Sequence, residues 1–432
     1  MVASASSAKL DTARSALESA CADVADAGEQ DAVDGVAASM VARPSSTEQV
    51  AEVMRAAAAY HLAVVPRGRG TKLTWGRPPT RVDLVVDLLR MNAVIDHAAG
   101  DLIVEAQAGT ALADVQQTVA GAGQRLAVDE TVPGASVGGT LATGTSGPGR
   151  VAVGTVRDLL IGVTVVRVDG VVAKSGGRVV KNVAGYDLGK LVIGSFGTLA
   201  VVTQAVFRLH PLPAARRVLT QGFDDAERAQ HLVQEVLHAQ VVPAAVEVEW
   251  LGEGAGILAV LLEGTEAGVD GRQASALTLL GDGSRSSEEL PARWGRYPWD
   301  DEETAAGAGG QRPTAIKATF GLSGLAQVLA SARAAAGQAR VPLNLRGSAG
   351  AGVVYASIPA VADVGAVSAV VDRLRSVCTS LGGAVVVLDA PPHVKAAIDT
   401  WGPVPAIDLM RRVKDQFDPE HRLAPGRFVG GI

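Results

Sequence analysis

The sequence predicts an α+β protein built from two domains. With 432 residues, the chain is long for a single domain and comfortable for two. Apolar residues make up 48% of it, enough for a sizeable core, and strand-like runs alternate with helical patterns along most of its length. At His210-Pro211-Leu212-Pro213 the pattern is interrupted and its texture changes, so we place the domain boundary just behind, at residue 215.

The first domain is expected over residues 36–215, behind an N-terminal helical arm over residues 1–35. Apolar residues from Leu10 to Cys21 recur at helical spacing and predict the helix of this arm. Ser46, followed three residues later by a glutamine, resembles a capping box and predicts a second helix. The expected elements of this domain are helices over 47–60 and 112–122, strands over 62–65, 82–86, 102–106 and 199–209, and a hairpin of 159–168 with 171–174 around Asp169-Gly170.

The second domain is expected over residues 216–404. Within it, residues 265–312 are rich in glycine, serine, alanine and acidic residues, and we interpret them as a low-complexity surface insertion. We find no convincing internal repeat. The expected helices are 226–238, 325–336 and 364–381, and the expected strands are 245–250, 257–262, 315–320, 353–357 and 384–388.

Charge and cysteine content exclude several classes of protein. A net charge of −6 argues against nucleic acid as the main partner. Cys21 and Cys378 are the only cysteines, too few for a disulfide framework or for a cluster-binding set, so any iron–sulfur centre would sit on another chain. The first seven residues lack a basic and an apolar region, and no apolar run approaches the roughly 18 residues of a membrane helix. We therefore expect a soluble protein of a reducing compartment, without a signal peptide.

Three glycine-rich motifs occur in the first domain. In Val64 to Thr71 a strand runs into glycines that would let backbone N–H groups converge on a phosphate, although a glycine-rich segment after a strand is, by itself, more often only a turn. It lacks the third glycine of the Rossmann fingerprint and the Gly-Lys-Ser/Thr of a P-loop. The second motif, Thr131 to Gly147, alternates small residues and hydroxyls with apolar residues, which indicates an ordered segment. The third comprises Gly176 to Leu188 and Gly194 to Thr203.

The order and spacing of these motifs resemble the PCMH-type FAD-binding domain of the vanillyl-alcohol-oxidase superfamily. The stretches Lys181 to Leu188 and Gly194 to Leu199 are similar to those of the flavin subunits of bacterial glycolate oxidases, in particular the second of these flavin subunits. Phe417-Asp418-Pro419 and Pro425-Gly426-Arg427 resemble the closing motif, with Ala424 in place of the usual asparagine. The resemblance covers residues 40–215 strongly and 315–432 weakly.

This resemblance implies a two-subdomain FAD-binding domain, followed by an α+β cap domain with a mainly antiparallel sheet. Residues 405–432 would return to the FAD domain. The first motif would bind the diphosphate, the second the phosphates and ribityl chain, and Val201 the adenine edge. The implied cofactor-binding residues are Pro66, Arg67, Gly68, Arg69, Gly70, Thr71, Thr131, Pro133, Gly134, Ser136, Val137, Gly138, Gly139, Ala142, Thr143, Ser146 and Val201.

Covalent flavin in this superfamily uses a histidine or cysteine near the first motif. Residues 66–76 contain neither, so we expect FAD to be held non-covalently. Lys181 and Tyr186 either serve the cofactor or pin their segment against the second domain, and both interpretations remain open.

The resemblance also implies what the active site should contain. Related catalytic subunits and D-2-hydroxy-acid dehydrogenases carry clustered histidines in the second domain, which bind a metal or take the hydroxyl proton. The seven histidines here show no such cluster, and Phe196 replaces a family glutamate. We therefore expect no metal site. As pocket candidates on or beside the second-domain strands we name Trp250, Lys317, Arg346, a candidate carboxylate anchor, and Tyr355.

Two functions fit these expectations. The chain is an accessory or electron-relay FAD subunit of a glycolate oxidase-like complex, beside a catalytic flavin subunit and an iron–sulfur subunit; alternatively it is a stand-alone 2-hydroxy-acid oxidase or dehydrogenase. The missing histidine cluster favours the first. A domain of this fold that has lost its flavin is disfavoured by the intact glycine motifs. We expect a cytoplasmic protein, with partners as its only route to the membrane surface.

Overall fold

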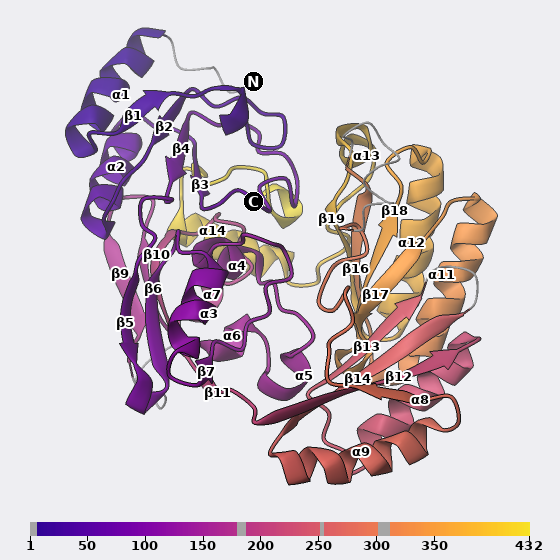
Figure 1. Ribbon diagram of the computed structural model, residues 1–432. Helices are drawn as coiled ribbons and strands as arrows, with labels where there is room; N and C mark the ends of the chain where they lie inside the picture. The colour runs from indigo at the N-terminus through magenta and orange to yellow at the C-terminus, as the bar shows by residue number, and fades with distance from the viewer. Residues whose placement is uncertain (1–6, 179–186, 251–254, 301–311) are drawn as a thin grey trace. The chain divides into compact units, whose positions relative to one another are not determined.

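The computed structural model describes residues 7–178, 187–250, 255–300 and 312–432, which divide into two compact units (Figure 1). Unit 1 comprises Met1–Thr145, Thr155–Pro211 and Val404–Ile432. Unit 2 comprises Ser146–Gly154 and Leu212–Pro403. The C-terminal segment thus belongs with the N-terminal half of the chain, and a short segment from within that half belongs with unit 2.

The first sheet of unit 1 is mostly parallel. It contains β1 (Val24–Asp26), β2 (Met40–Ala42), β4 (Leu84–Asp87) and β3 (Val64–Arg67) in this order, with β4 parallel to both β2 and β3. Helix α2 (Thr47–Ala59) links β2 to β3, and Ser46 caps it by accepting a hydrogen bond from the Gln49 amide at 3.2 Å. The helix that the sequence predicts at this position is confirmed.

The N-terminal helix α1 (Ser7–Ala20) is confirmed as a helix but not as an arm. Ala13, Leu17 and Cys21 are buried, and α1 packs against α2. The spacing that predicts the helix also gives it one apolar stripe, and burial of that stripe docks it on the domain.

The second sheet of unit 1 is antiparallel, in the order β5 (Val94–Ala98), β6 (Ile103–Gln107), β10 (Val201–Arg208), β8 (Leu160–Val166) and β9 (Val172–Gly176). The predicted hairpin is β8 with β9, and Gly170 takes a φ of +78° in its turn. The other elements of this unit are α3 (Leu112–Ala120), β7 (Gln124–Arg125), α4 (Val137–Thr143), α6 (Val156–Leu159), α7 (Gly189–Val192), β11 (His210–Pro211) and α14 (Ile407–Phe417).

Unit 2 is built on one antiparallel sheet with the strand order β15-β12-β14-β13-β17-β18-β16-β19. Its strands are β12 (Ala215–Phe223), β13 (Ala245–Trp250), β14 (Gly256–Gly264), β15 (Arg285–Ser287), β16 (Thr314–Thr319), β17 (Asn344–Ser348), β18 (Val353–Ile358) and β19 (Ala384–Asp389). The helices are α5 (Arg150–Val153), α8 (Ala226–His238), α9 (Glu266–Leu280), α11 (Leu325–Ala339), α12 (Val364–Ser380) and α13 (Pro392–Ala397). This confirms the predicted α+β class with an antiparallel sheet.

The topology of unit 2 is a repeat that the sequence does not reveal. The segments β12-α8-β13-β14-α9-β15 and β16-α11-β17-β18-α12-β19 follow the same βαββαβ course. In each, the strands lie in the order fourth, first, third, second, and the two halves meet at the β13–β17 pair. The expectation of no internal repeat is therefore wrong at the level of topology.

The two faces of this sheet have different partners. Alternate strand residues such as Val248, Val260 and Ile316 form one core with helices α8, α9, α11 and α12, which lie on that face (Figure 1). The opposite face carries the remaining residues of each strand. Leu290 and Trp294 pack there against Ala245, Ala259 and Leu261.

The expectation of a low-complexity insertion over 265–312 is wrong for its first half. Residues 266–280 form α9, whose Val269, Ala276 and Leu280 are buried against the sheet, and residues 285–287 form an edge strand. Three well-spaced apolar residues are enough to dock this helix, although glycine and alanine dominate its composition. Residues 301–311 lie outside the described part.

Candidate functional site

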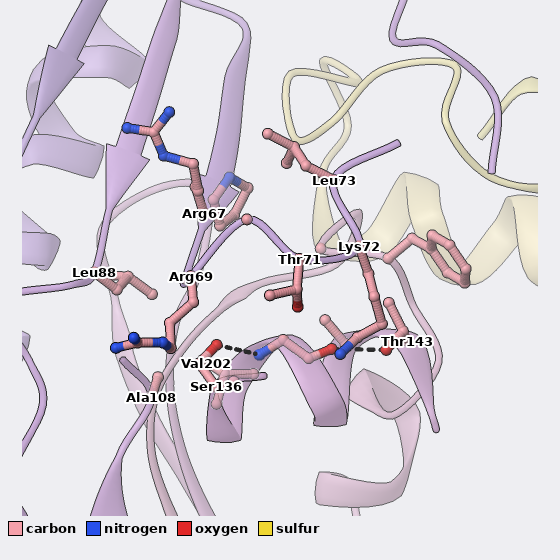
Figure 2. Close-up of a pocket in the computed structure, with 18 of the residues that line it drawn as sticks. Arg67, Arg69, Thr71, Lys72, Leu73, Leu88, Ala108, Ser136, Thr143 and Val202 are labelled. Carbon is pink, nitrogen blue, oxygen red and sulfur yellow. Dashed lines mark hydrogen bonds between the residues drawn. The ribbon is translucent and has the colours of Figure 1, made fainter. Parts of the chain in front are cut away.

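A pocket in unit 1 collects most of the predicted cofactor residues (Figure 2). It lies where the loop after β3 passes over helix α4, beside the start of β10. The residues that line it are Pro66, Arg67, Gly68, Arg69, Gly70, Thr71, Lys72, Leu73, Leu88, Ala108, Ser136, Gly138, Gly139, Ala142, Thr143, Ser195, Phe196, Gly197, Ala200, Val202 and Arg427.

Glycines allow the β3 loop and α4 to approach each other closely. A Cβ on Gly68 would lie 2.2 Å from the Ser136 hydroxyl oxygen, and a Cβ on Gly138 would lie 2.8 Å from the Ala108 Cβ. Gly70 takes a φ of +74°, which favours glycine. The pocket floor therefore depends on small residues at these positions.

The β3 loop offers free backbone donors. Within the described residues, the N–H groups of Arg69, Gly70, Thr71 and Lys72 donate to no protein acceptor. Consecutive free N–H groups in a glycine-containing turn form a concavity suited to phosphate oxygens. This is the contact that the sequence predicts for the FAD diphosphate.

Helix α4 offers no such donors at its start. The Val137 and Gly138 N–H groups donate to the Thr110 and Ala108 carbonyls at 2.9 and 2.7 Å. The Gly139 N–H donates to the Ser136 hydroxyl at 3.2 Å, a bond drawn in Figure 2. The helix therefore supplies shape to the pocket rather than backbone donors.

The Gly194-Ser-Phe-Gly motif forms another wall of the pocket. The Gly194 and Phe196 N–H groups donate to the Leu141 and Ala142 carbonyls at the end of α4, at 2.9 and 2.8 Å. The Phe196 ring lies 5.7 Å from that of Phe428 in the C-terminal segment. The residue that replaces a family glutamate is thus an apolar wall residue.

The C-terminal segment forms hydrogen bonds with the chain after the β3 loop and with the chain after the Gly194 motif. Arg427 donates to the Leu73 and Trp75 carbonyls at 2.7 and 2.8 Å. The fully buried Lys414 on α14 donates to Asp418 and to the carbonyls of Thr198 and Leu423, at 2.6, 2.8 and 3.0 Å. Ala424 takes a φ of +43°, where the usual asparagine would be favoured, and its N–H still reaches the Val64 carbonyl at 2.8 Å.

The cations of the pocket are not equivalent. Arg67 forms salt bridges with Asp31 at 2.8 Å and Asp87 at 2.7 Å, and its side chain points away from α4 in Figure 2. Lys72 is only 6% exposed and, among the described residues, forms no salt bridge. Burial lowers the pKa of Lys72 to about 8, with a smaller opposite effect from Glu130. Lys72 was not predicted as a site residue, because sequence gives no sign that a loop lysine is buried.

Most of the predicted cofactor residues line the pocket, and the others lie elsewhere. Pro66 to Thr71, Ser136, Gly138, Gly139, Ala142 and Thr143 line the pocket. Val137 and Val201 point into the core, and the neighbours Ala200 and Val202 line the pocket instead. Thr131, Pro133 and Gly134 lie in the loop before α4, and Ser146 begins the segment that belongs to unit 2. Lys181 and Tyr186 lie outside the described residues.

In unit 2, three of the four pocket candidates lie in one row on the face of the sheet that the helices do not cover. Lys317 pairs with Tyr355, Tyr355 with Arg346, and Arg346 with Glu249 across neighbouring strands. Directly opposite residues of an antiparallel sheet share a face. Trp250 follows Glu249 and therefore lies on the other face, in the helix-covered core.

The Arg346 guanidinium is already bound by the protein. It donates to a Glu249 carboxylate oxygen at 2.6 Å and to the Arg296 and Tyr297 carbonyls at 3.3 Å. Its predicted role as a carboxylate anchor would require displacement of Glu249.

Tyr355 is surrounded by cations and aromatic rings. Arg150 donates to its hydroxyl at 3.2 Å, and the Tyr297 and Trp299 rings lie 4.6 and 5.9 Å from its ring. Burial raises the pKa of Tyr355, but the Arg150 and Lys317 cations more than offset this, so the pKa lies below its ordinary value. Sequence missed Arg150 because it lies in a segment distant along the chain.

The histidines are dispersed, and all seven fall within the described residues. His61 and His421 pair with Glu420 and Asp415, whereas His231 and His238 lie on α8. None lines the unit 1 pocket or the Tyr355 row. Across the described parts of the chain, no group of three or more His, Cys, Asp or Glu side chains is placed to hold a metal ion.

Sequence comparison matches two parts of the chain to known families. Residues 38–176 match the FAD binding domain family, and residues 397–428 match the C-terminal domain of FAD linked oxidases. The chain is 30% identical over 208 residues to glycolate oxidase subunit GlcD of Bacillus subtilis, covering 48% of this chain and 44% of that protein. It is 32% identical over 208 residues to glycolate oxidase subunit GlcE of Escherichia coli K12, covering 48% and 57%. The chain thus matches about half the length of these relatives.

Solved structures extend the likeness to the whole fold. A 4-ethylphenol oxidase from Gulosibacter chungangensis superposes with a TM-score of 0.73 at 15% identity, over 98% of this chain and 97% of that one. An alkyldihydroxyacetonephosphate synthase superposes with a TM-score of 0.69 at 17% identity, over 91% and 78%. No helix in the described parts is both long and apolar enough to cross a membrane. The fold is the predicted PCMH-type one, and residues 38–176 match the FAD binding domain family.

Proposed function

We propose that the chain is an FAD-dependent oxidoreductase that serves as a flavin subunit of a glycolate oxidase-like complex. The observation that carries this is the unit 1 pocket, which lies in a domain matched to FAD binding proteins and in which glycines allow close backbone approach. Among the residues that the structure describes, the β3 loop N–H groups have no acceptor and the buried Lys72 has no salt bridge. Bound FAD would supply the electron acceptor for oxidation of a 2-hydroxy acid. None of the described lining residues is histidine or cysteine, which supports non-covalent attachment.

The accessory position, that of the second flavin subunit in such a complex, follows from what the Tyr355 row contains. A catalytic subunit needs a base within reach of the substrate hydroxyl and a cation for its carboxylate. The dispersed histidines supply neither, and Arg346 is neutralised by Glu249. A catalytic flavin subunit and an iron–sulfur subunit would complete the complex in the cytoplasm.

One observation favours the stand-alone alternative. Tyr355, with its lowered pKa, lies between Arg150 and Lys317. The phenol would be the base for the hydroxyl of a 2-hydroxy acid, and the two cations would bind its carboxylate. A buried phenol activated by neighbouring cations can act as a general base.

Reduction kinetics of the purified chain separate the two functions. The protein is expected to be yellow, to release FAD on acid denaturation, and to be reduced by glycolate or D-lactate far more slowly than ordinary dehydrogenases turn over. Rapid bleaching of the flavin by one member of a panel of 2-hydroxy acids would replace the subunit role with the stand-alone one. A colourless preparation that takes up no added FAD would contradict both.

Co-purification from the native host tests whether the chain has partner subunits. The proposal expects a hetero-oligomer whose iron content exceeds what this chain can bind, because its two cysteines are both buried and free. A homogeneous preparation of this chain alone, with full activity, would contradict the accessory role.

A further inference from the structure

Lys72 is a buried cation without a salt-bridge partner among the described residues. Its side chain is 6% exposed and extends from the β3 loop toward the Thr143 end of α4 (Figure 2). Among the described residues it forms no salt bridge. The charge of Glu130 raises the pKa of Lys72, but this carboxylate accepts its hydrogen bond from the Gly134 N–H, at 2.8 Å. An unpaired buried ammonium is unfavourable unless something binds it.

The other polar groups around Lys72 are already engaged. The first three N–H groups of α4 bond to Thr110, Ala108 and Ser136. The Arg67 charge is met by Asp31 and Asp87. The N–H groups of residues 69–72, the Thr71 hydroxyl, the exposed Arg69 side chain and Lys72 are among the described lining groups that remain to meet an anion in this pocket.

We infer that Lys72 binds the diphosphate of FAD and selects phosphate-bearing flavins over riboflavin. The inference rests on the proposed placement of FAD in the unit 1 pocket. The diphosphate carries two negative charges, and the β3 loop would surround it with free N–H groups while Lys72 neutralises it from the α4 side. A lysine reaches phosphate as a point charge and needs no bidentate geometry.

Binding of FAD, FMN and riboflavin to flavin-free protein tests this. Lys72→Met is expected to weaken FAD binding about 10- to 100-fold, since bonds to charged groups are worth about 1.5–3 kcal/mol. Riboflavin binding should change less than about twofold, and FMN should fall in between. Lys72→Arg is expected to keep most of the FAD affinity. The control is Lys174→Met, an exposed lysine on β9, which should leave all three affinities unchanged.

The possible results distinguish the diphosphate contact, any role of Lys72 in cofactor binding, and the placement of FAD. Equal loss of FAD and riboflavin affinity would place Lys72 at the isoalloxazine and overturn the diphosphate contact. Unchanged affinities in a folded Lys72→Met protein would overturn any role in cofactor binding. If the wild-type protein bound no flavin at all, the placement of FAD itself would fail.

The pH dependence of wild-type binding gives a second readout that needs no variant. The free Lys72 has a pKa of about 8, and an adjacent anion raises it in the complex. FAD affinity should therefore be full below pH 8 and decline as pH rises above it, whereas Lys72→Met should show no such decline. The other charged groups that face the site are Glu130, Arg67, Arg69 and Arg427, and α4 has no ionisable side chain. A flat wild-type profile would contradict the inference.

Discussion

The buried Lys414–Asp418 pair should control the stability of unit 1. Both side chains have no exposed surface, and the lysine joins α14 to the Thr198 and Leu423 carbonyls. Asp418 in turn accepts hydrogen bonds from the Arg422 and Leu423 N–H groups at 3.0 and 2.7 Å. Lys414→Met keeps the length of the side chain and removes its charge.

The cost follows from what the substitution leaves behind. Asp418 would remain a buried carboxylate with two backbone donors, and two carbonyls would lose their partner. Breaking a buried ion pair in this way costs about 3–5 kcal/mol. For a unit of this size that corresponds to a fall in Tm of roughly 10 °C. Because Thr198 follows the pocket wall at Ser195 to Gly197, flavin retention should weaken as well.

Urea and thermal unfolding of single and double variants measure this. Adding Asp418→Asn to Lys414→Met removes the uncompensated charge and should recover about 1–3 kcal/mol, a coupling typical of residues in contact. Arg411→Met, on the same helix but in an exposed pair with Asp408, should cost less than about 1 kcal/mol. A loss below about 1 kcal/mol for Lys414→Met would refute the reasoning, because the pair would then carry no more than a surface salt bridge.

Two further predictions concern the cofactor and the chemistry. Gly139→Val should reduce flavin content several-fold with little change in circular dichroism, because its Cβ would lie 3.0 Å from the Ser136 hydroxyl and the branch would enter the pocket. The ratio of flavin to protein absorbance measures this. The control is Gly177→Val, since a Cβ on Gly177 would meet no atom within 4 Å. Tyr355→Phe should leave the slow reduction of the isolated chain by 2-hydroxy acids unchanged; a drop of about 100-fold or more would identify Tyr355 as a general base and favour the stand-alone enzyme.

Local sequence signals were sufficient for the elements and for the floor of the pocket. Ser46 and Gln49 predict the start of α2, Asp169-Gly170 predicts the β8–β9 hairpin, and both are confirmed. The glycines of the β3 loop point to close backbone approach, and that approach is found against Ser136. Each of these signals acts over a few residues, so it can be read without knowing the tertiary structure.

Long-range pairing is what the sequence could not predict. The two βαββαβ halves of unit 2 share a strand order that depends on pairing between residues far apart in the sequence. Arg346 was a candidate substrate anchor because nothing in sequence indicates that Glu249 lies opposite it, at a separation fixed by the β13–β17 register. Arg150 and Tyr355 are likewise brought together only by the tertiary fold.

The distribution of partners among the buried cations separates structural from functional positions. Lys414 and Lys395 are met by Asp418 and Asp389, at 2.6 and 2.8 Å. Arg67 and Arg346 are also met by carboxylates, and Arg427 by two carbonyls. Since an uncompensated buried charge is costly, a folded chain keeps one only where a ligand completes it. Arg150 donates to the Gly147 carbonyl at 2.9 Å and to the Tyr355 hydroxyl at 3.2 Å. Among the described residues Lys72 forms no salt bridge, so it is the position where we expect a bound anion.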